Sequence, residues 1–317
     1  MKPRIFAALA TYNGERFLPE MLRSLCQVTR PLNRIIAIDD ASSDATVSIL
    51  ESFQEKLPLQ IIRRKKNGGH RIAFSDAFHE IQQTASPEDF VAILDQDDIC
   101  IPEKFSLLEN ALEENPAATL AFGDACVIDE NGKQIASSWR KLAGISSHIS
   151  TISRLCGTNN VNGCLSLFRA SLLPKILPIP DWIPVYDEWI SLCAAKSGNI
   201  LAIENPVLNY RLHGKNSIGL GPQIAMSQSL KINIRVSNGL LQSAKLLTLT
   251  PEEIAFVSEY KNFLERSLSH SCNFHWIPWL WKNQCELYPG CSASRRLKKI
   301  FGASLGFPFC KRFLGKN

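Results

Sequence analysis

The stretch Phe90–Asp98, with the sequence FVAILDQDD, runs from an apolar segment directly into three carboxylates. The segment Phe90–Leu94 is short and apolar, and it predicts a buried strand. Three carboxylates within four residues repel one another, and a fold accepts that cost most readily when a cation neutralises them. Asp95 and Asp97 follow a strand end at i and i+2, so that they could meet one Mg²⁺ or Mn²⁺ beside substrate phosphates. The alternative is a solvated acidic turn in which Asp98 caps the next helix.

Around this stretch the chain alternates short apolar runs with amphipathic runs, which is typical of βαβ units and a mostly parallel sheet. The expected strands are Ile5–Ala10, Arg34–Ile38, Leu59–Arg63 and Phe90–Leu94. The expected helices between and after them are Phe17–Cys26, Ala45–Lys56, Ile72–Thr84 and Glu103–Asn115. In open α/β sheets ligands bind beyond the carboxyl ends of the strands. The acidic stretch is therefore expected at the binding edge.

After residue 115 the pattern predicts shorter strands separated by turns. The expected strands are Leu120–Phe122, Ala125–Ile128, Cys164–Phe168, Ile200–Ile203 and Val207–Tyr210. Asn131-Gly132 favours a turn that closes a hairpin, and the polar stretch Ser137–Thr158 predicts a mobile loop region. A helix is expected from about Asp187 to Lys196, and the chain from Gln223 onward has a helical pattern.

Two more polar turns follow expected strands at the same edge. Asp39–Asp44 follows the second strand, and its carboxylates could accept hydrogen bonds from a nucleobase or ribose; the alternative is an Asx-turn with a helix cap. Thr11–Gly14 follows the first strand and offers Tyr12 as an aromatic lining for a base pocket. Together the three turns predict a binding crevice. The chain has no Gly-x-Gly-x-x-Gly and no P-loop, which argues against a Rossmann dehydrogenase or a P-loop NTPase.

The composition is that of a globular protein, with 45% hydrophobic and 21% charged residues in 317. No apolar run approaches the roughly 18–20 residues that cross a bilayer. The formal net charge of +5 is too small to indicate a nucleic-acid partner. The ten cysteines show no paired metal spacing, and the first apolar run is too short for a signal peptide. A cytoplasmic protein is therefore expected.

The small net charge is the sum of two parts of opposite sign. Residues 1–220 carry 22 Lys and Arg against 25 Asp and Glu, whereas residues 221–317 carry 13 against 5. We therefore expect a domain over 1–220 and a basic helical extension over 221–317. Three tryptophans lie in Trp276–Lys282, ahead of a cluster of Lys and Arg, and this combination suits an anionic membrane surface. The alternative for 276–317 is an appendage whose tryptophans cover the first domain.

The ordered motifs resemble glycosyltransferase family 2, in particular its rhamnosyltransferase-like branch. The resemblance covers roughly residues 4–220. It rests on Thr11–Glu15 (TYNGE), Asp39–Thr46 (DDASSDAT), Asp95–Ile99 (DQDDI), Asn162–Cys164 (NGC) and Tyr210–Asn216 (YRLHGKN). Ala41 replaces the family's usual glycine, and Cys100 stands where a tryptophan is common.

The resemblance implies a GT-A fold and an inverting transfer of sugar from a nucleotide-sugar donor such as dTDP-rhamnose or a UDP-sugar. By position, the residues implied to bind the donor nucleotide are Thr11, Tyr12, Asn13, Asp39, Asp40, Asp95 and Gln96. Asp97, Asp95 and His213 are implied to hold a divalent cation, Mn²⁺ or Mg²⁺. Asn162, Gly163 and Cys164 are implied to form a loop near the transferred sugar.

An inverting transfer also needs a general base beside the acceptor hydroxyl. The candidate stretch is Tyr186–Trp189 (YDEW), where the family's related motif reads H-D-W-W. Asp187 therefore maps to the base, and Glu188, which departs from the motif, is a rival. Trp189 is expected either to stack on a sugar ring or to pack in the core. The alternative for the carboxylates is a helix start favoured by the helix dipole.

The sequence thus predicts a metal-dependent, inverting glycosyltransferase of bacterial cell-surface polysaccharide synthesis, such as that of lipopolysaccharide O-antigen. A glycan or lipid-linked glycan acceptor is expected at the cytoplasmic face of the inner membrane. A sugar-nucleotide nucleotidyltransferase would share the acidic α/β site but should carry a Gly- and Arg-rich loop near the first strand, which this chain lacks. A second alternative is a catalytically degenerate relative that acts as a binding subunit.

Overall fold

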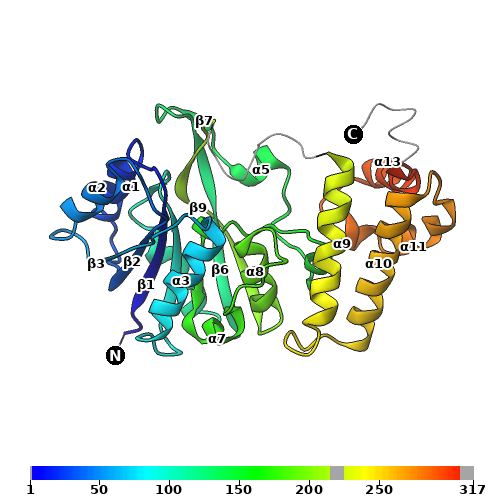
Figure 1. The fold of residues 1–317 in the computed structure, drawn as a ribbon, viewed down its shortest axis with the longest axis horizontal. Coiled ribbons are helices and arrows are strands. Elements are labelled where there is room, and N and C mark those ends of the chain that lie inside the picture. Colours follow the sequence, from blue (N-terminus) through cyan, green and yellow to red (C-terminus); the bar gives the residue numbers. More distant parts are fainter. Residues whose placement is uncertain (1, 215–224, 308–317) are drawn as a thin grey trace. The chain divides into compact units, whose positions relative to one another are not determined.

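The computed structural model describes residues 2–214 and 225–307 (Figure 1). The chain divides into two compact units. The first unit contains Met1–Ala143, Val161–Ile179 and Val185–Asn216, and the second contains Gly144–Asn160, Pro180–Pro184 and Ser217–Asn317. The domain boundary expected at residue 220 lies outside the described residues and stays a prediction.

The first unit is built on one mixed sheet whose amino-terminal half is parallel. Its strand order begins β3-β2-β1-β4, where β1 is Ile5–Thr11, β2 is Arg34–Asp39, β3 is Leu59–Arg63 and β4 is Phe90–Asp95. The side chains of β1, β2 and β4 are almost all buried, as in parallel sheets that are covered on both faces. The register sets Thr11 opposite Asp39 and Ala10 opposite Asp95. The three polar turns therefore leave the sheet at one edge, as predicted.

Three helices connect these strands and a fourth follows them, all close to the ranges that the sequence predicts. They are α1 (Leu18–Leu25), α2 (Thr46–Ser52), α3 (His70–Gln82) and α4 (Lys104–Glu113). In α3 the buried residues recur at helical spacing, with Phe74, Phe78 and Ile81 among them, and this face packs on β1 and β2. Figure 1 shows α3 lying across the front of the sheet.

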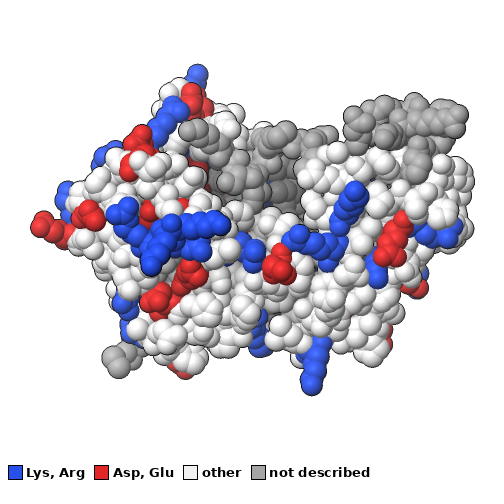
Figure 2. Space-filling model, viewed as in Figure 1, with Lys and Arg blue, Asp and Glu red and all other residues white. Residues whose placement is uncertain are grey.

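A group of Lys and Arg side chains lies over the amino-terminal end of α3 in Figure 2. The segment that leads from β3 to α3 carries Arg63, Arg64, Lys65 and Lys66, of which Arg64 is partly buried and the others are exposed. Arg64 bonds to Asp40, whereas Lys65 and Lys66 extend into solvent. The first unit therefore has a basic surface of its own, besides the basic carboxyl-terminal segment.

The second half of the sheet is mixed. It contains β5 (Ile99–Cys100), β6 (Ala118–Ile128), β7 (Gln134–Ala136), β8 (Ser166–Arg169) and β9 (Asn199–Arg211). Strand β8 runs antiparallel between β4 and β6, and β9 runs parallel to β6. The predicted hairpin is confirmed, because β6 and β7 pair antiparallel around Gly132, which has φ of +85°.

Strands β6 and β9 are each continuous where the sequence predicts two short strands. Gly123-Asp124 and Asn205-Pro206 interrupt the apolar pattern, but the chain stays in the ladder through register shifts at these points. A β-carbon on Gly123 would lie 2.4 Å from Cγ1 of Val207, so glycine is what lets the two strands approach there. The prediction of separate strands was wrong because a bulge breaks the pattern without ending the strand.

The expected loop over Ser137–Thr158 is also wrong, since two short helices form in it: α5 (Trp139–Ala143) and α6 (Thr151–Leu155). Polar side chains start both of them. Asp124 accepts a hydrogen bond from the backbone N–H of Arg140, at 3.1 Å, and Ser150 caps α6 by accepting from the N–H of Ser153 at 3.0 Å. The remaining helices of the first unit are α7 (Leu173–Ile176) and α8 (Tyr186–Ala195).

The carboxyl-terminal part of the second unit is helical, as predicted. It contains α9 (Met226–Gln242), α10 (Pro251–Ser269), α11 (Ile277–Lys282), α12 (Gln284–Leu287) and α13 (Ala293–Ser304). Phe263, Leu264, Leu280 and Ile300 form its buried core. Trp276 and Trp279 pack against Phe263, with ring centroids 5.6 and 6.2 Å away. Among the described helices, none has the length and apolar character of a membrane span.

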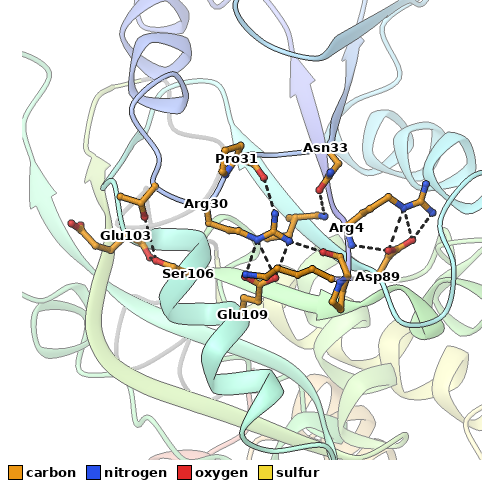
Figure 3. Close-up of polar contacts among 12 residues, drawn as sticks. Arg4, Arg30, Pro31, Asn33, Asp89, Glu103, Ser106 and Glu109 are labelled. Atoms are coloured by element: carbon orange, nitrogen blue, oxygen red, sulfur yellow. Dashed lines mark hydrogen bonds and ion pairs between the residues drawn. The ribbon is translucent and has the colours of Figure 1, made fainter.

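Ion pairs hold the amino edge of the sheet, where the parallel strands begin (Figure 3). Arg4 binds Asp89 through its guanidinium at 2.7 Å and through its backbone N–H at 2.8 Å, and Arg30 binds Glu109 at 2.8 Å. Lys2 lies 3.0 Å from the same glutamate. Although burial opposes ionisation, the hydrogen bonds from Arg4 and Ser86 lower the pKa of Asp89 to about 2. The buried carboxylates of this edge are therefore neutralised by cations of the chain itself.

Candidate functional site

At the carboxyl edge, Asp39 and Asp40 are both buried and bonded within the protein. Asp39 accepts from the Thr11 hydroxyl at 3.3 Å and from the N–H of Ser42 at 3.0 Å. Asp40 accepts from the N–H groups of Gly68 and Gly69, at 2.9 and 2.7 Å. These bonds shape the turn after β2 and tie the segment before α3 to it. Contact of either carboxylate with a nucleoside stays a prediction.

The turns after β1 and β4 are joined by Gln96. Its side-chain amide accepts from the N–H of Tyr12 at 2.9 Å and donates to the carbonyl of Tyr12 at 3.1 Å. Gly14 makes room for it, because a β-carbon there would lie 2.3 Å from Oε1 of Gln96. Asn13, with φ of +45°, accepts from the N–H of Ser43 at 2.9 Å. The Tyr12 side chain remains 47% exposed beside this linked set of turns.

Asp95, Asp98 and Cys164 gather beyond the end of β4. One possible ligand atom of each lies within 4.8 Å of the others. Burial and the neighbouring Asp97 raise the pKa of Asp95 to about 7, and the same two causes hold that of Asp98 well above its usual range. Asp98 accepts from the N–H of Arg211 at 2.9 Å. It does not cap the next helix, because α4 begins at Lys104 and its N-cap residue is Glu103. Oδ2 of Asp98 is buried without a hydrogen-bond partner among the described residues.

Asp97 lies beside His213; that the two residues hold one cation, as the resemblance implies, stays a prediction. Nε2 of His213 lies 2.8 Å from Oδ2 of Asp97, and both side chains are largely buried. Arg211 clamps the same turn, because its Nε donates to the carbonyl of Asp97 at 2.9 Å and its Nη2 to Glu20 at 2.6 Å. The sequence motif contains Arg211 but gave it no role. The expected ligands are thus divided between a pair, Asp97 with His213, and the group around Asp95.

Asp95, Asp97 and Asp98, which we call the acid cluster, fit a hard divalent cation. Mg²⁺ and Mn²⁺ prefer carboxylate oxygens, and the buried Oδ2 of Asp98 is an oxygen that such an ion would satisfy. Cys164 is a less suitable ligand, because burial raises the pKa of its thiol well above the usual range and keeps it protonated. Asp95 and Asp98, which the structure brings within 4.8 Å of each other, are therefore the residues that would hold the ion, whereas Asp97 lies 2.8 Å from His213.

The two candidate bases begin α8 in the same unit. Oδ2 of Asp187 accepts from the N–H of Gly163 at 3.1 Å. Burial and the charge of Asp187 raise the pKa of Glu188 to about 7. Gly163 lies so close to Tyr186 that a β-carbon would come within 2.6 Å of the phenol oxygen. Trp189 is fully buried and donates to the carbonyl of Ile176 at 2.8 Å, so it packs in the core and presents no face to a sugar.

The loop Asn162–Cys164 rests on a buried lysine that sequence reasoning missed. Asn162 accepts from the N–H of Leu165 at 3.0 Å to close a short 3₁₀ turn, and the carbonyl of Cys164 accepts from Nζ of Lys104 at 2.7 Å. Lys104 is 0% exposed. The signal in the sequence is its spacing, because Lys104 lies four residues before Leu108 and so shares the buried face of α4.

The model of "Glycosyl transferase family 2" matches residues 7–177. The chain belongs to this family. An uncharacterized glycosyltransferase of Nostoc sp. is 25% identical over 222 residues, which are 68% of this chain and 66% of that protein. The amylovoran biosynthesis glycosyltransferase AmsE of Erwinia amylovora is 29% identical over 129 residues, which are 40% of this chain and 47% of that protein. The match to these two family members thus spans just under two thirds and about half of their length.

A solved structure shows the same fold. The crystal structure of Staphylococcus aureus TarS residues 1–349 in complex with UDP-GlcNAc superposes with a TM-score of 0.60 over 95% of this chain and 81% of that one, at 18% identity. TarS is described as a poly(ribitol-phosphate) β-N-acetylglucosaminyltransferase. The predicted GT-A fold, a mixed α/β sheet flanked by helices with a helical carboxyl-terminal part, is confirmed.

Proposed function

We propose that this family 2 glycosyltransferase moves a sugar, with inversion, from a nucleotide-sugar donor to a hydroxyl of a glycan acceptor in cell-surface polysaccharide synthesis. The observation that carries the proposal is that a candidate base lies beside the acid cluster at the carboxyl edge of the sheet. Asp187 accepts from the N–H of Gly163 at 3.1 Å, and the sulfur of the next residue, Cys164, lies within 4.8 Å of carboxylate oxygens of Asp95 and Asp98. The names of the relatives AmsE and TarS support a polysaccharide or polyol-phosphate acceptor. The structure of TarS with UDP-GlcNAc supports a UDP-sugar as the first donor to test.

The residues divide the reaction into donor binding and proton transfer. Tyr12, half exposed, would stack on the nucleobase, and the acid cluster would hold Mn²⁺ or Mg²⁺ with His213 against Asp97. When bound, the ion would offset negative charge on the departing nucleoside diphosphate. Asp187, oriented by the N–H of Gly163, would take the proton of the acceptor hydroxyl. That oxygen attacks the anomeric carbon on the face opposite the diphosphate, which inverts the configuration.

Glu188 is the rival base because its carboxyl has a pKa of about 7, where general-base catalysis at neutral pH is efficient. The two assignments differ in their pH profiles. A Glu188 base would make kcat rise with pH through about 7, and Glu188→Gln would remove that limb. If Asp187 is the base, the pH dependence of kcat in Glu188→Gln should match that of the wild type, and the loss of kcat should appear in Asp187→Asn.

The test is a panel of UDP-, dTDP- and GDP-sugars with Mn²⁺ or Mg²⁺, in which release of the nucleoside diphosphate is measured. We expect one donor to be turned over. Asp187→Asn should lower kcat by about 100-fold or more, as loss of a general base does, and Asp97→Asn should lower it by a similar factor because a group that would hold the ion is lost. The matched control is Glu204→Gln, whose side chain is 85% exposed and which should equal the wild type. Donor binding without turnover, or full activity in both aspartate variants, would overturn the catalytic assignment.

We propose further that the exposed part of α11 and α13 contacts the anionic cytoplasmic face of a membrane, where a lipid-linked acceptor would be presented. Two of the three tryptophans pack inside the second unit, but Trp281 is 54% exposed. In α13 the exposed Leu297 and Phe301 are one turn apart, and Arg295 and Lys298 are exposed on the same helix. An apolar strip flanked by cations is the arrangement of an interfacial helix.

A further inference from the structure

Lys104 occupies a position that is costly for a lysine. Its side chain is 0% exposed, and it is the first residue of α4. Burial of a cation costs several kcal/mol unless partners offset it, and the positive end of the helix dipole opposes a cation in the first turn. Its ammonium bonds to the carbonyl of Cys164 at 2.7 Å and to the sulfur of Cys100 at 3.7 Å, and it lies 5.4 Å from the centre of the Phe105 ring; none of these groups is an anion.

The first partner of Lys104 leads to the candidate base. Cys164 and its neighbour Gly163 belong to one short 3₁₀ turn. The carbonyl of Cys164 is held by Lys104, and the N–H of Gly163 holds Oδ2 of Asp187 at 3.1 Å. Tyr186 packs closely against the turn, because its phenol oxygen lies 2.6 Å from where a Gly163 β-carbon would be. The ammonium group and the carboxylate therefore bond to consecutive residues of one short turn.

The charge of Lys104 also acts on the acid cluster. Its ammonium lies beside the cluster, because it is 2.7 Å from the carbonyl of Cys164, and the sulfur of the same residue lies within 4.8 Å of a carboxylate oxygen of Asp95 and of Asp98. The carboxylates at the amino edge of the sheet have Arg and Lys partners at hydrogen-bond distance. Lys104 instead donates to a backbone carbonyl of the 163–165 turn. It thus supplies positive charge to the cluster without occupying the carboxylate oxygens that a divalent cation would need.

We propose that Lys104 is a positioning residue: its buried ammonium fixes the 163–165 turn that orients Asp187, and its charge supports the acid cluster while no divalent cation is bound. The kinetic half of this inference rests on the proposed function. The second half concerns metal binding and folding and does not.

The experiment compares Lys104→Met, which removes both charge and donor, with Lys104→Gln, which removes the charge and keeps a donor. Lys175→Met is the matched control, since that lysine donates to Ser197 at the protein surface. For each protein we would measure kcat and donor KM, the Mn²⁺ dissociation constant by calorimetry, and Tm with and without saturating Mn²⁺. In Lys104→Met we expect kcat to fall about 10- to 100-fold with donor KM within about threefold, as for a misplaced catalytic group.

Both Lys104 variants should bind Mn²⁺ more tightly than the wild type, by about tenfold, because the ion no longer meets a resident positive charge. Their Tm should fall without metal and recover largely with Mn²⁺. Lys104→Gln should keep more of kcat than Lys104→Met. Equal losses of Tm with and without Mn²⁺, together with wild-type kcat and Mn²⁺ affinity, would show a merely structural lysine and overturn the inference. If no donor is turned over by the wild type, the proposed function fails, whereas the Mn²⁺ and Tm measurements still decide the role of the charge.

Discussion

Ala41 has a backbone conformation that alanine adopts only at a cost. Its φ is +64°, in the turn that follows Asp39 and Asp40. The left-handed conformation costs a residue with a β-carbon about 1–2 kcal/mol, and the greater freedom of glycine in the unfolded chain offsets about 0.5–1 kcal/mol of that. We expect Ala41→Gly to raise the free energy of unfolding by about 0.5–1 kcal/mol in urea denaturation. Ala45→Gly, where φ is −73°, should not raise it. A less stable Ala41→Gly would contradict the strain.

Glu188 should make the stability of the fold depend on pH near neutrality. Its pKa rises from an ordinary 4.5 to about 7 in the folded protein, so the native state keeps a proton that the unfolded chain has lost. The protonated form stabilises the fold fully below the unfolded pKa, and this is lost as pH rises through the folded value. We expect Glu188→Gln to raise the free energy of unfolding by about 1–2 kcal/mol at pH 8, discounted for its partial exposure, and to leave it unchanged at pH 4. Equal effects at the two pH values would refute this origin.

For single residues, the sequence predicted which side chains lie near the strand ends more often than it predicted which groups they contact. Asp97 lies beside His213, and the motifs assign both residues to one cation site. Asp98, considered both as part of the acidic stretch that a cation would neutralise and as a helix cap, is buried, and Lys104 was not considered at all. Trp189 is in the core. Motifs fix which residues lie near a strand end, whereas burial depends on which later segments cover them, and those contacts are not local in the sequence.

The ion pair of Arg4 with Asp89 lies directly before β4, and it should stabilise the folded state only above acid pH. The pKa of Asp89 is lowered to about 2 by its bonds to Arg4 and Ser86, against burial. A depressed carboxyl pKa stabilises the fold above the unfolded value, ordinarily 3.8, and the gain is lost as pH falls through 2. We expect Asp89→Asn to lower the free energy of unfolding by about 1–2 kcal/mol at pH 7, and by much less near pH 2.5, in urea titrations. Glu204→Gln, at an exposed site, serves as the control. A loss of the same size at both pH values would contradict an electrostatic cause.

The prediction of helices and strands succeeded where a periodic apolar pattern determines the element and failed where one polar group or one close contact determines it. The parallel strands and α1 to α4 follow from runs of buried residues. Helices α5 and α6 depend instead on side-chain caps from Asp124 and Ser150. Strands β6 and β9 continue through a bulge at Gly123, because Val207 packs against a residue with no side chain. The contact of Gly123 with Val207 joins residues about 80 apart, and the bond of Asp124 to Arg140 joins residues 16 apart, so neither belongs to one local pattern.

For the whole molecule, the uneven distribution of charge predicts how the chain should bind lipid. Wild-type protein should sediment with vesicles that contain phosphatidylglycerol and not with pure phosphatidylcholine. Replacement of both Arg295 and Lys298 by Gln should weaken binding about 30-fold, since each cation near an anionic surface contributes about 1 kcal/mol. Lys65→Gln with Lys66→Gln, an equal change of charge on the first unit, is the control and should bind normally. Binding that falls equally in both pairs would show nonspecific attraction and remove the case for α13.

Segments of the two units alternate along the sequence. The second unit takes Gly144–Asn160 and Pro180–Pro184 from the middle of the sequence before it takes the carboxyl-terminal helices. Ser153 of the first of these segments donates to Glu286 at 2.9 Å, and Trp182 of the other lies against Gly239. Exchange of the helical part between relatives by a single recombination near residue 220 would therefore separate these partners. An evolutionary or engineered exchange must therefore transfer all three segments of the second unit together, and the carboxyl-terminal helices alone are not an exchangeable part.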